Sequence, residues 1–303
     1  MTSICSEQRL FAPAIESVRA RLNSAGEIDH LPQLLARLHW TDLTFSLEAP
    51  EVFEDVPDLP DRIRGALGRA LERTCGNRKS SRCDAWTLLY GKQFLGDSGG
   101  EFHPFVITTD RTSDRMVCIV RLVGFADCWS EDVAAAAFEA FRAGIAIRRS
   151  GVQRVRLSVL GATRERMWFR PPAAFKPSVL LRFKTPLVVR NRRAVDGSLA
   201  SLSASMRDRL LSVARWCDVC PSPQIMRRMH EPLWTVERAD LRPVRWRRRS
   251  STHPDGTALL GLAGDIVLGG MTETGLLLCW AMEPFHAGGG SSGGLGRFIA
   301  IPW

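Results

Sequence analysis

The order of the expected strands and helices predicts an α+β fold of two ferredoxin-like domains in tandem, with a glycine-rich loop near the carboxy terminus. Strand-like and helix-like segments follow one another twice in the order strand, helix, strand, strand, helix, strand, which is the ferredoxin-like order. A proline-rich join at residues 170–177 separates the two series. The chain of 303 residues is 45% hydrophobic, enough apolar material for two ordinary globular domains. The predicted division is an amino-terminal helical extension at residues 1–30, a first domain at 31–168 and a second at 178–303.

The elements of the first series are identified by the spacing of their apolar residues. Apolar residues three or four positions apart indicate a helix, and apolar residues at alternate positions indicate a strand. The expected elements are a helix at 7–24, a strand at 37–47, a loop at 48–60, a helix at 59–73, a strand at 114–125, a helix at 131–146 and a strand at 152–160.

The helix at 59–73 carries a basic face. It begins at Pro60 and Asp61, residue types that favour the first turn of a helix. Its apolar residues share one side, and that side is expected to be buried. The opposite side carries Arg62, Arg69 and Arg73, with Arg64 at the border.

The second series repeats the same order after the proline-rich join. The expected elements are a strand at 179–189, a helix at 198–216, two strands within 244–267, a helix at 272–285 and a strand at 296–302. Two such halves leave a cleft between their sheets, which suits an extended ligand.

The charge of the chain favours a polyanionic partner. There are 41 lysines and arginines against 32 acidic residues, giving a formal net charge of +9 and a sequence pI near 9.6. The basic excess is almost wholly arginine, the residue suited to bidentate phosphate recognition. No apolar run approaches the ~18 residues of a membrane span, and residues 1–7 do not resemble a signal peptide. We therefore expect a cytoplasmic protein whose eight cysteines stay mostly reduced.

The glycine-rich loop lies between an apolar helix and the final strand. Without Cβ atoms, the backbone amides of Gly288, Gly290, Gly294 and Gly296 can approach a phosphate chain, and Arg297 can add a bidentate contact. We therefore predict RNA contacts for these five residues. The alternative is a disordered Gly/Ser linker. It is disfavoured because a strand-like apolar segment follows directly.

Two other segments are predicted to contact RNA. In a basic strand, arginines bracket a tryptophan and could bind phosphates while the ring stacks on a base. These residues are Arg245, Trp246, Arg247, Arg248, Arg249, Ser250 and Ser251. A second basic turn contains Arg190, Arg192 and Arg193. In both segments the alternative is a basic surface that is merely solvated.

Four ordered motifs resemble those of the RAMP superfamily, and within it the sixth CRISPR-associated protein family, the endoribonucleases that process precursor CRISPR RNA. Residues 64–71 resemble the family's first-helix signature, residues 182–187 a family strand, and Ser250-Ser251 a serine pair after a basic strand. The family's closing motif matches this sequence at Met282-Glu283, His286, Gly288, Ser291, Ser292 and Gly294-Leu295-Gly296-Arg297-Phe298.

The resemblance implies a tandem RRM/RAMP fold and a metal-independent endoribonuclease without a cofactor. Such an enzyme cleaves precursor CRISPR RNA within the repeat by attack of a ribose 2′-hydroxyl, leaves a 2′,3′-cyclic phosphate, and retains the repeat hairpin. Its partners are the repeat RNA, the mature CRISPR RNA and other Cas subunits of an interference complex. The candidate catalytic residues are Arg64, Arg69, Arg73 and His286.

Several departures from the family pattern keep alternatives open. Gly289 and Gly293 replace a lysine and an aromatic residue, and no histidine follows the first helix, where many members carry a general base. His286 could instead pin the glycine-rich loop. The protein could be a non-catalytic RAMP subunit that binds guide RNA, or a general single-strand RNA-binding module. Four suitably placed zinc ligands are not apparent around Cys217 and Cys220.

Overall fold

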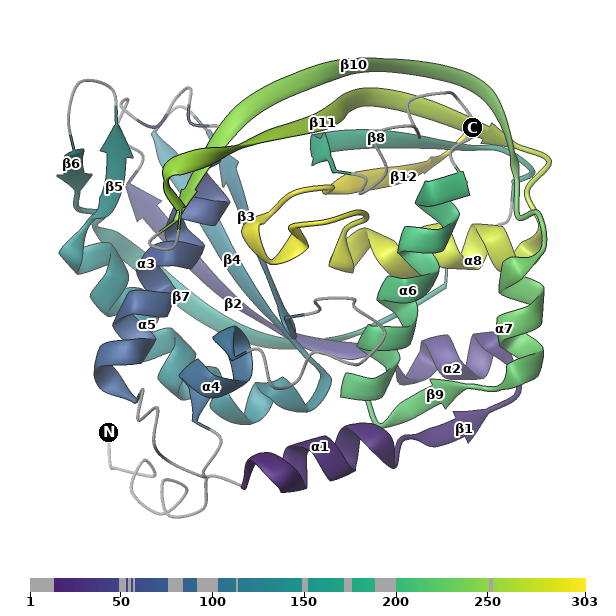
Figure 1. Cartoon of the computed structure of the whole chain (residues 1–303), viewed down its shortest axis with the longest axis horizontal. Helices are drawn as coiled ribbons and strands as arrows, with labels where there is room; N and C mark the ends of the chain where they lie inside the picture. Colours follow the sequence, from purple (N-terminus) through teal and green to yellow (C-terminus); the bar gives the residue numbers. More distant parts are fainter. Residues whose placement is uncertain are drawn as a thin grey trace.

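The computed structural model describes residues 14–48, 53, 56, 58–75, 84–91, 103–112, 114–148, 152–171, 176–188, 200–250 and 253–303, which form two four-stranded sheets (Figure 1). The first sheet has the order β3-β4-β2-β7 and consists of β2 (His39–Glu48), β3 (Phe105–Arg111), β4 (Arg115–Val123) and β7 (Val159–Trp168). The second has the order β10-β11-β8-β12 and consists of β8 (Val179–Leu187), β10 (Thr235–Ser250), β11 (His253–Gly269) and β12 (Phe298–Pro302).

Each sheet has ferredoxin-like connectivity. In the first half, α3 (Leu59–Thr74) follows the first strand and α5 (Ser130–Ala143) follows the third. In the second half the corresponding helices are α6 (Ala200–Trp216) and α8 (Glu273–Met282). With the four strands numbered in chain order, both sheets read 4-1-3-2. This confirms the predicted α+β fold of tandem ferredoxin-like halves. The strands of the two sheets fall within 31–168 and 178–303, and those boundaries stay a prediction.

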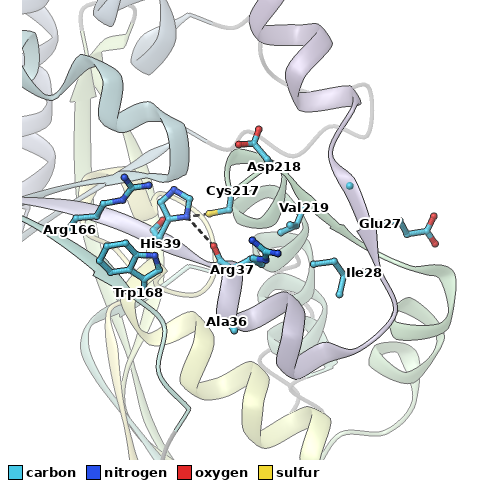
Figure 2. A pocket seen from close by; sticks show the side chains of 11 residues that line it. Glu27, Ile28, Ala36, Arg37, His39, Arg166, Trp168, Cys217, Asp218 and Val219 are labelled. Atoms are coloured by element: carbon cyan, nitrogen blue, oxygen red, sulfur yellow. Dashed lines mark hydrogen bonds between the residues drawn. The ribbon is translucent and has the colours of Figure 1, made fainter.

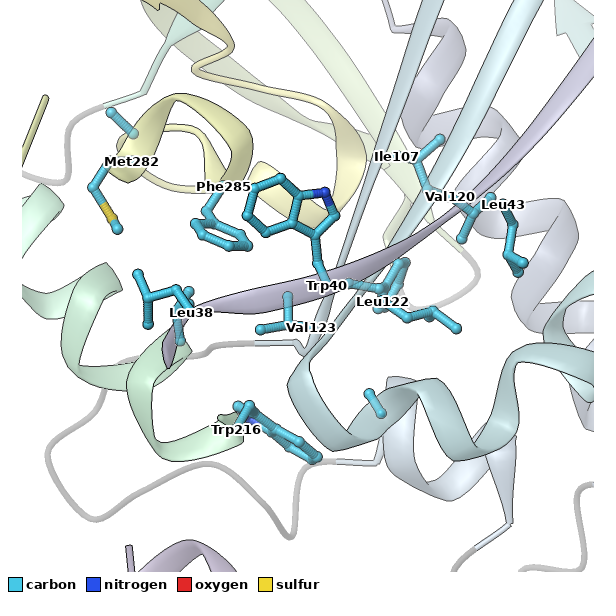
Figure 3. Close-up of a cluster of buried hydrophobic side chains, with 14 of the residues drawn as sticks. Leu38, Trp40, Leu43, Ile107, Val120, Leu122, Val123, Trp216, Met282 and Phe285 are labelled. Carbon is cyan, nitrogen blue, oxygen red and sulfur yellow. The ribbon is translucent and has the colours of Figure 1, made fainter. Parts of the chain in front are cut away.

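The two faces of the first sheet have different partners because side chains alternate along β2. Leu43, Phe45 and Leu47 are buried, and the Phe45 ring lies 5.4 Å from the Phe141 ring of α5. The opposite face carries Trp40, whose ring meets Phe285 of the second half edge to face at 5.3 Å. Figure 3 shows Trp40 and Phe285 within this shared apolar cluster. The two halves therefore share one hydrophobic core.

The amino-terminal segment packs against the second half of the chain. It contains α1 (Ile15–Asn23), β1 (Gly26–Ile28) and α2 (Leu31–Arg37). β1 pairs in parallel with β9 (Val219–Pro221), and α2 contacts both β9 and α8. Arg21 also forms a bidentate ion pair with Asp218, at 2.7 and 2.6 Å.

Several predicted elements differ from those observed. The strand expected at 152–160 is two strands, β6 (Val152–Val155), which forms a hairpin with β5 (Ile145–Arg148), and the start of β7. The helix expected at 131–146 ends at Ala143 because Gly144 adopts φ 89°. The helix expected at 272–285 ends at Met282 and tightens into a 3₁₀ turn at Glu283–Phe285. Residues 7–13 of the helix expected at 7–24 lie outside the described residues.

The strands expected within 244–267 are far longer than predicted, with 16 residues in β10 and 17 in β11. Together they arch over the molecule in Figure 1. Two short helices, α4 (Ala85–Tyr90) and α7 (Pro223–His230), and strand β3 have no counterpart in the prediction. Among the described helices, none combines the length and the apolar character needed to cross a membrane.

Candidate nucleic-acid interface

The packing of α3 explains why its sequence contains glycine. A Cβ at Gly68 would lie 2.7 Å from Cε1 of Tyr90, so glycine allows α4 to approach the helix. The Tyr90 hydroxyl donates a hydrogen bond of 2.7 Å to the carbonyl of Arg64. Burial raises the pKa of Tyr90. Tyr90 is thus partly buried against the core, and its hydrogen bond fixes the backbone that carries Arg64.

Arg64 lies in a partly buried cluster of rings. Its guanidinium carbon is 5.2 Å from the centre of the Tyr90 ring and 5.8 Å from that of Phe105. Its Nη2 lies 3.4 Å from Nε2 of His103, and Nδ1 of His103 lies 2.7 Å from the carbonyl oxygen of Leu89. The Nε atom of Arg64 is buried and has no hydrogen-bond partner among the described residues. The sequence does not reveal this contact, because Arg64 and His103 are 39 residues apart in the chain.

Arg69 and Arg73 are the exposed members of the predicted arginine set. The Nη1 atom of Arg69 lies beside Gly65, 3.8 Å from where a Cβ of that residue would be, which is an ordinary contact distance. Desolvation and the neighbouring charges of Arg154 and Arg73 lower the pKa of Arg69. Arg73 lies 3.7 Å from Glu139 of α5. The structure therefore brings Arg64, Arg69 and Arg73 together on α3 and adds Arg154 from β6.

The glycine-rich loop is buried, which corrects the expectation of exposed amides. Gly288, Gly294 and Gly296 are buried, whereas Gly290 is exposed. The amide of Gly288 donates to Ser205 Oγ at 2.8 Å, that of Gly294 to Ser291 O at 2.9 Å, and that of Gly296 to Pro186 O at 2.9 Å. These amides already have protein partners, so direct RNA contacts by them stay a prediction that the geometry does not favour.

The loop connects the two halves of the molecule. A Cβ at Gly293 would lie 2.6 Å from Oδ1 of Asp61, and one at Gly294 would lie 2.6 Å from Cβ of Pro60. The loop thus packs tightly on the first turn of α3. Arg297 forms a bidentate ion pair with Asp110 of β3, at 2.7 and 2.8 Å, and its RNA contact stays a prediction.

A second arginine holds the turn before the loop. Arg121 of β4 forms a bidentate pair with Asp42 of β2, with both distances 2.7 Å, and donates from Nη1 to the carbonyl of Pro284 at 2.6 Å. The side chains of Arg121 and Asp42 retain only 16% and 14% exposure. A charge pair of the first sheet therefore positions the chain that leads into the loop of the second half.

His286 is enclosed within the glycine-rich loop. It is 1% exposed, has φ 64°, and its Nδ1 lies 3.2 Å from the carbonyl oxygen of Leu295. Burial lowers the pKa of His286 well below its usual value, and the charges of Arg121, Arg297 and Arg209 lower it further. A neutral, enclosed imidazole that binds a loop carbonyl favours pinning over the predicted catalytic role.

The basic strand lies on a two-stranded ribbon that projects beyond the second sheet. Within the described residues, β11 pairs with β8 only from Leu262 to Leu268, whereas it continues to pair with β10 as far as Ser250 and His253. Arg245 is exposed on this ribbon. Its backbone also carries the predicted RNA contacts Trp246, Arg247, Arg248, Arg249 and Ser250. The other predicted contacts Ser251, Arg190, Arg192 and Arg193 lie outside the described residues.

A pocket of about 620 Å³ lies where the amino-terminal segment meets the ends of β2 and β7 (Figure 2). Trp168 is 50% exposed there, and the guanidinium carbon of Arg166 lies 5.3 Å from its ring centre. His39 Nδ1 lies 3.0 Å from the carbonyl oxygen of Arg37, and the Cys217 thiol contacts the carbonyl of His39 at 3.5 Å. The sequence does not reveal this pocket because its walls come from distant segments.

Burial raises the pKa of the Cys217 thiol to about 12. Within the part of the chain that the structure describes, no three His, Cys, Asp or Glu side chains are grouped as a metal site requires.

The sequence matches no protein-family model and no curated protein. The structure resembles solved Cas6 structures. For the product complex of Cas6 (TTHB231) of Thermus thermophilus, the TM-score is 0.52 at 15% identity, over 86% of this chain and 100% of that one. For the product complex of Cas6 (TTHA0078), the TM-score is 0.50 at 18% identity, over 87% of this chain and 99% of that one. At such low identity the likeness establishes a fold shared with these two structures.

Proposed function

We propose that the protein is a member of the Cas6 family that cleaves precursor CRISPR RNA within the repeat. One observation carries the proposal. The two sequence signatures that resemble the family, one starting on α3 and the other in the glycine-rich loop, meet in space, because Gly293 and Gly294 pack on Asp61 and Pro60. The shared fold and the net charge of +9 support the same function.

The proposed reaction needs no metal ion. A ribose 2′-oxygen attacks the adjacent phosphorus, and the bond to the 5′-oxygen breaks, leaving a 2′,3′-cyclic phosphate and a 5′-hydroxyl. The protein must align the attacking oxygen, accept its proton and stabilise the negative charge on the phosphorane. Arg69 and Arg73 are exposed on α3 and supply that charge stabilisation. The ribbon of β10 and β11 holds the repeat hairpin through its phosphates.

The proposed partners follow from the same function. The substrate is the repeat in precursor CRISPR RNA, the retained product is the mature CRISPR RNA, and other Cas subunits receive it in an interference complex. The protein would act in the cytoplasm, where the transcript is made.

A second candidate function is favoured by the burial of His286 and by the lack of histidine on α3. In this case the protein is a RAMP subunit that binds guide RNA without cutting it. An arginine guanidinium, with a pKa above about 12, is a poor proton acceptor, so α3 alone supplies no general base.

Incubation with repeat RNA and chelator tests the first function against the second. We expect one cut, with a 2′,3′-cyclic phosphate on the upstream fragment. A substrate with a deoxyribose just upstream of the cut should stay intact, because it lacks the nucleophile. Binding of intact RNA after long incubation would favour the non-catalytic subunit. Equal binding of a scrambled hairpin would indicate a general RNA-binding module.

A further inference from the structure

The contact between Arg64 and His103 defines which nitrogen of the imidazole carries the proton. Nδ1 of His103 lies 2.7 Å from the carbonyl oxygen of Leu89, which can only accept a hydrogen bond. On the other side, Nη2 of Arg64 lies 3.4 Å from Nε2. A guanidinium has donors and no acceptor. The proton of a neutral His103 is therefore on Nδ1, and Nε2 presents its lone pair toward α3.

The neighbouring side chains hold this arrangement. The rings of His103 and Phe105 lie 6.0 Å apart, and those of Tyr90 and Phe105 lie 5.4 Å apart. The Arg64 guanidinium rests over the latter two rings, and the Tyr90 hydroxyl binds the Arg64 backbone. An imidazole whose Nδ1 is bound to a backbone carbonyl and whose Nε2 faces a cation has the geometry of an oriented base.

We infer that His103 is the general base of the proposed cleavage, a role that the predicted set of Arg64, Arg69, Arg73 and His286 leaves unfilled. The inference rests on the proposed endoribonuclease function. The long contact of 3.4 Å and the unpaired Nε of Arg64 indicate a guanidinium whose donors are not fully used within the described residues. When RNA binds, Arg64 turns its donors to the scissile phosphate, and the 2′-hydroxyl replaces it at Nε2 of His103.

The proton transfer balances as follows. The 2′-O–H bond breaks and its proton moves to Nε2 of His103, while the 2′-oxygen forms a bond to phosphorus. The P–O5′ bond breaks, and the departing oxygen takes a proton from water. The imidazolium then returns its proton to solvent. Arg64 joins Arg69 and Arg73 of α3 in stabilising the negative charge of the phosphorane.

The other histidines whose surroundings are described lack this arrangement. His286 is enclosed within the loop, at 1% exposure. His39 lies in the pocket beside β9, with its Nδ1 on the carbonyl of Arg37. His230 is exposed at the end of α7, and His30 is exposed at the residue before α2. Among the described histidines, His103 is the one that contacts an arginine of α3, with its Nε2 3.4 Å from Nη2 of Arg64.

Single-turnover cleavage by His103→Gln tests the inference. The glutamine amide keeps a polar group near the position of Nε2 but cannot act as a base. We expect the rate to fall about 10²–10⁴-fold, the range of general base catalysis, with unchanged affinity for the deoxy-substituted RNA. The cleavage rate of the parent protein should rise with pH through an ionisation between about pH 5 and 8. This rise should be absent from the pH profile of the variant. His230→Gln is the matched control and should cleave as the parent does.

The outcomes separate the inference from the function on which it rests. If the parent cleaves and His103→Gln matches its rate or keeps the same pH limb, His103 is not the base and the endoribonuclease function stands. If the parent does not cleave, both are overturned. Should circular dichroism show the variant to be misfolded, the parent's pH profile decides, because the absence of an ionisation near neutrality would overturn the inference by itself.

Discussion

Replacing Gly296 with alanine is expected to lower the free energy of unfolding by about 2–5 kcal/mol. Gly296 has φ 68°, a conformation that costs a residue with a side chain about 1–2 kcal/mol. A Cβ there would also overlap the carbonyl of Ala287, so the loop must shift. The shift separates Ala287 N from Gly296 O, now 2.9 Å apart, and an unpaired buried polar group costs about 1–3 kcal/mol.

The assay is urea unfolding followed by tryptophan fluorescence, in which the loss should appear as a lower midpoint at an unchanged slope. Gly289→Ala is the matched control. Gly289 has no positive φ, and its Cβ would find its nearest atoms at 3.8 Å, an ordinary contact. We expect the control to change stability by less than about 0.5 kcal/mol. Equal midpoints for the two variants would refute the argument that the buried turn requires glycine.

Three further predictions concern charge. Arg69→Ala should lower the single-turnover cleavage rate by about 10²-fold with little change in affinity, because its charge acts chiefly in the transition state. Arg142→Ala is the control, since the side chain of Arg142 on α5 is 81% exposed, and this variant should cleave normally. Arg245→Ala should weaken RNA binding and reduce its salt slope by about one, measured by titration at several salt concentrations. His286→Asn should reduce the acid sensitivity of stability. The lowered pKa of His286 means that the unfolded state takes up the proton first, so parental stability is full above about pH 6.5 and falls as pH drops. Asparagine tolerates positive φ, and urea midpoints at pH 7 and pH 5 compare the two proteins.

The sequence predicts the fold well where the apolar pattern is local. The face of α3 that carries Ile63 and Leu67 is buried as its helical spacing indicates, and the final strand is buried at Phe298 and Ala300. The length of β10 is underestimated because alternation is weak along a ribbon whose outer part, among the described residues, pairs with no third strand. The hairpin of β5 and β6 is missed for a similar reason, since within the described part of the chain these strands pair with each other alone.

The site is less predictable because its contacts are non-local. Glycine freedom indicates an unusual backbone at Gly294 and Gly296, and both have positive φ. The glycine pattern cannot show whether the loop is open to solvent or packed against the other half of the molecule. In the structure the loop is packed. From the sequence, Arg297 is likewise expected to be an unpaired cation. In the structure it forms an ion pair with Asp110, which lies 187 residues earlier in the chain. Only the arginines of α3 are gathered by local geometry, and these the sequence does predict.

Because β1 pairs in parallel with β9, the amino-terminal segment packs against the second half of the chain, although the first half follows it directly in the sequence. A fragment that begins after the proline-rich join would carry β9 and α8 without the strand and helix that cover them. Co-production of residues 14–37 as a separate peptide should therefore improve the yield of such a fragment. For the same reason, a cut in the proline-rich join would not release two independent pieces. The amino-terminal segment, which belongs to the first piece, would still be paired with the second.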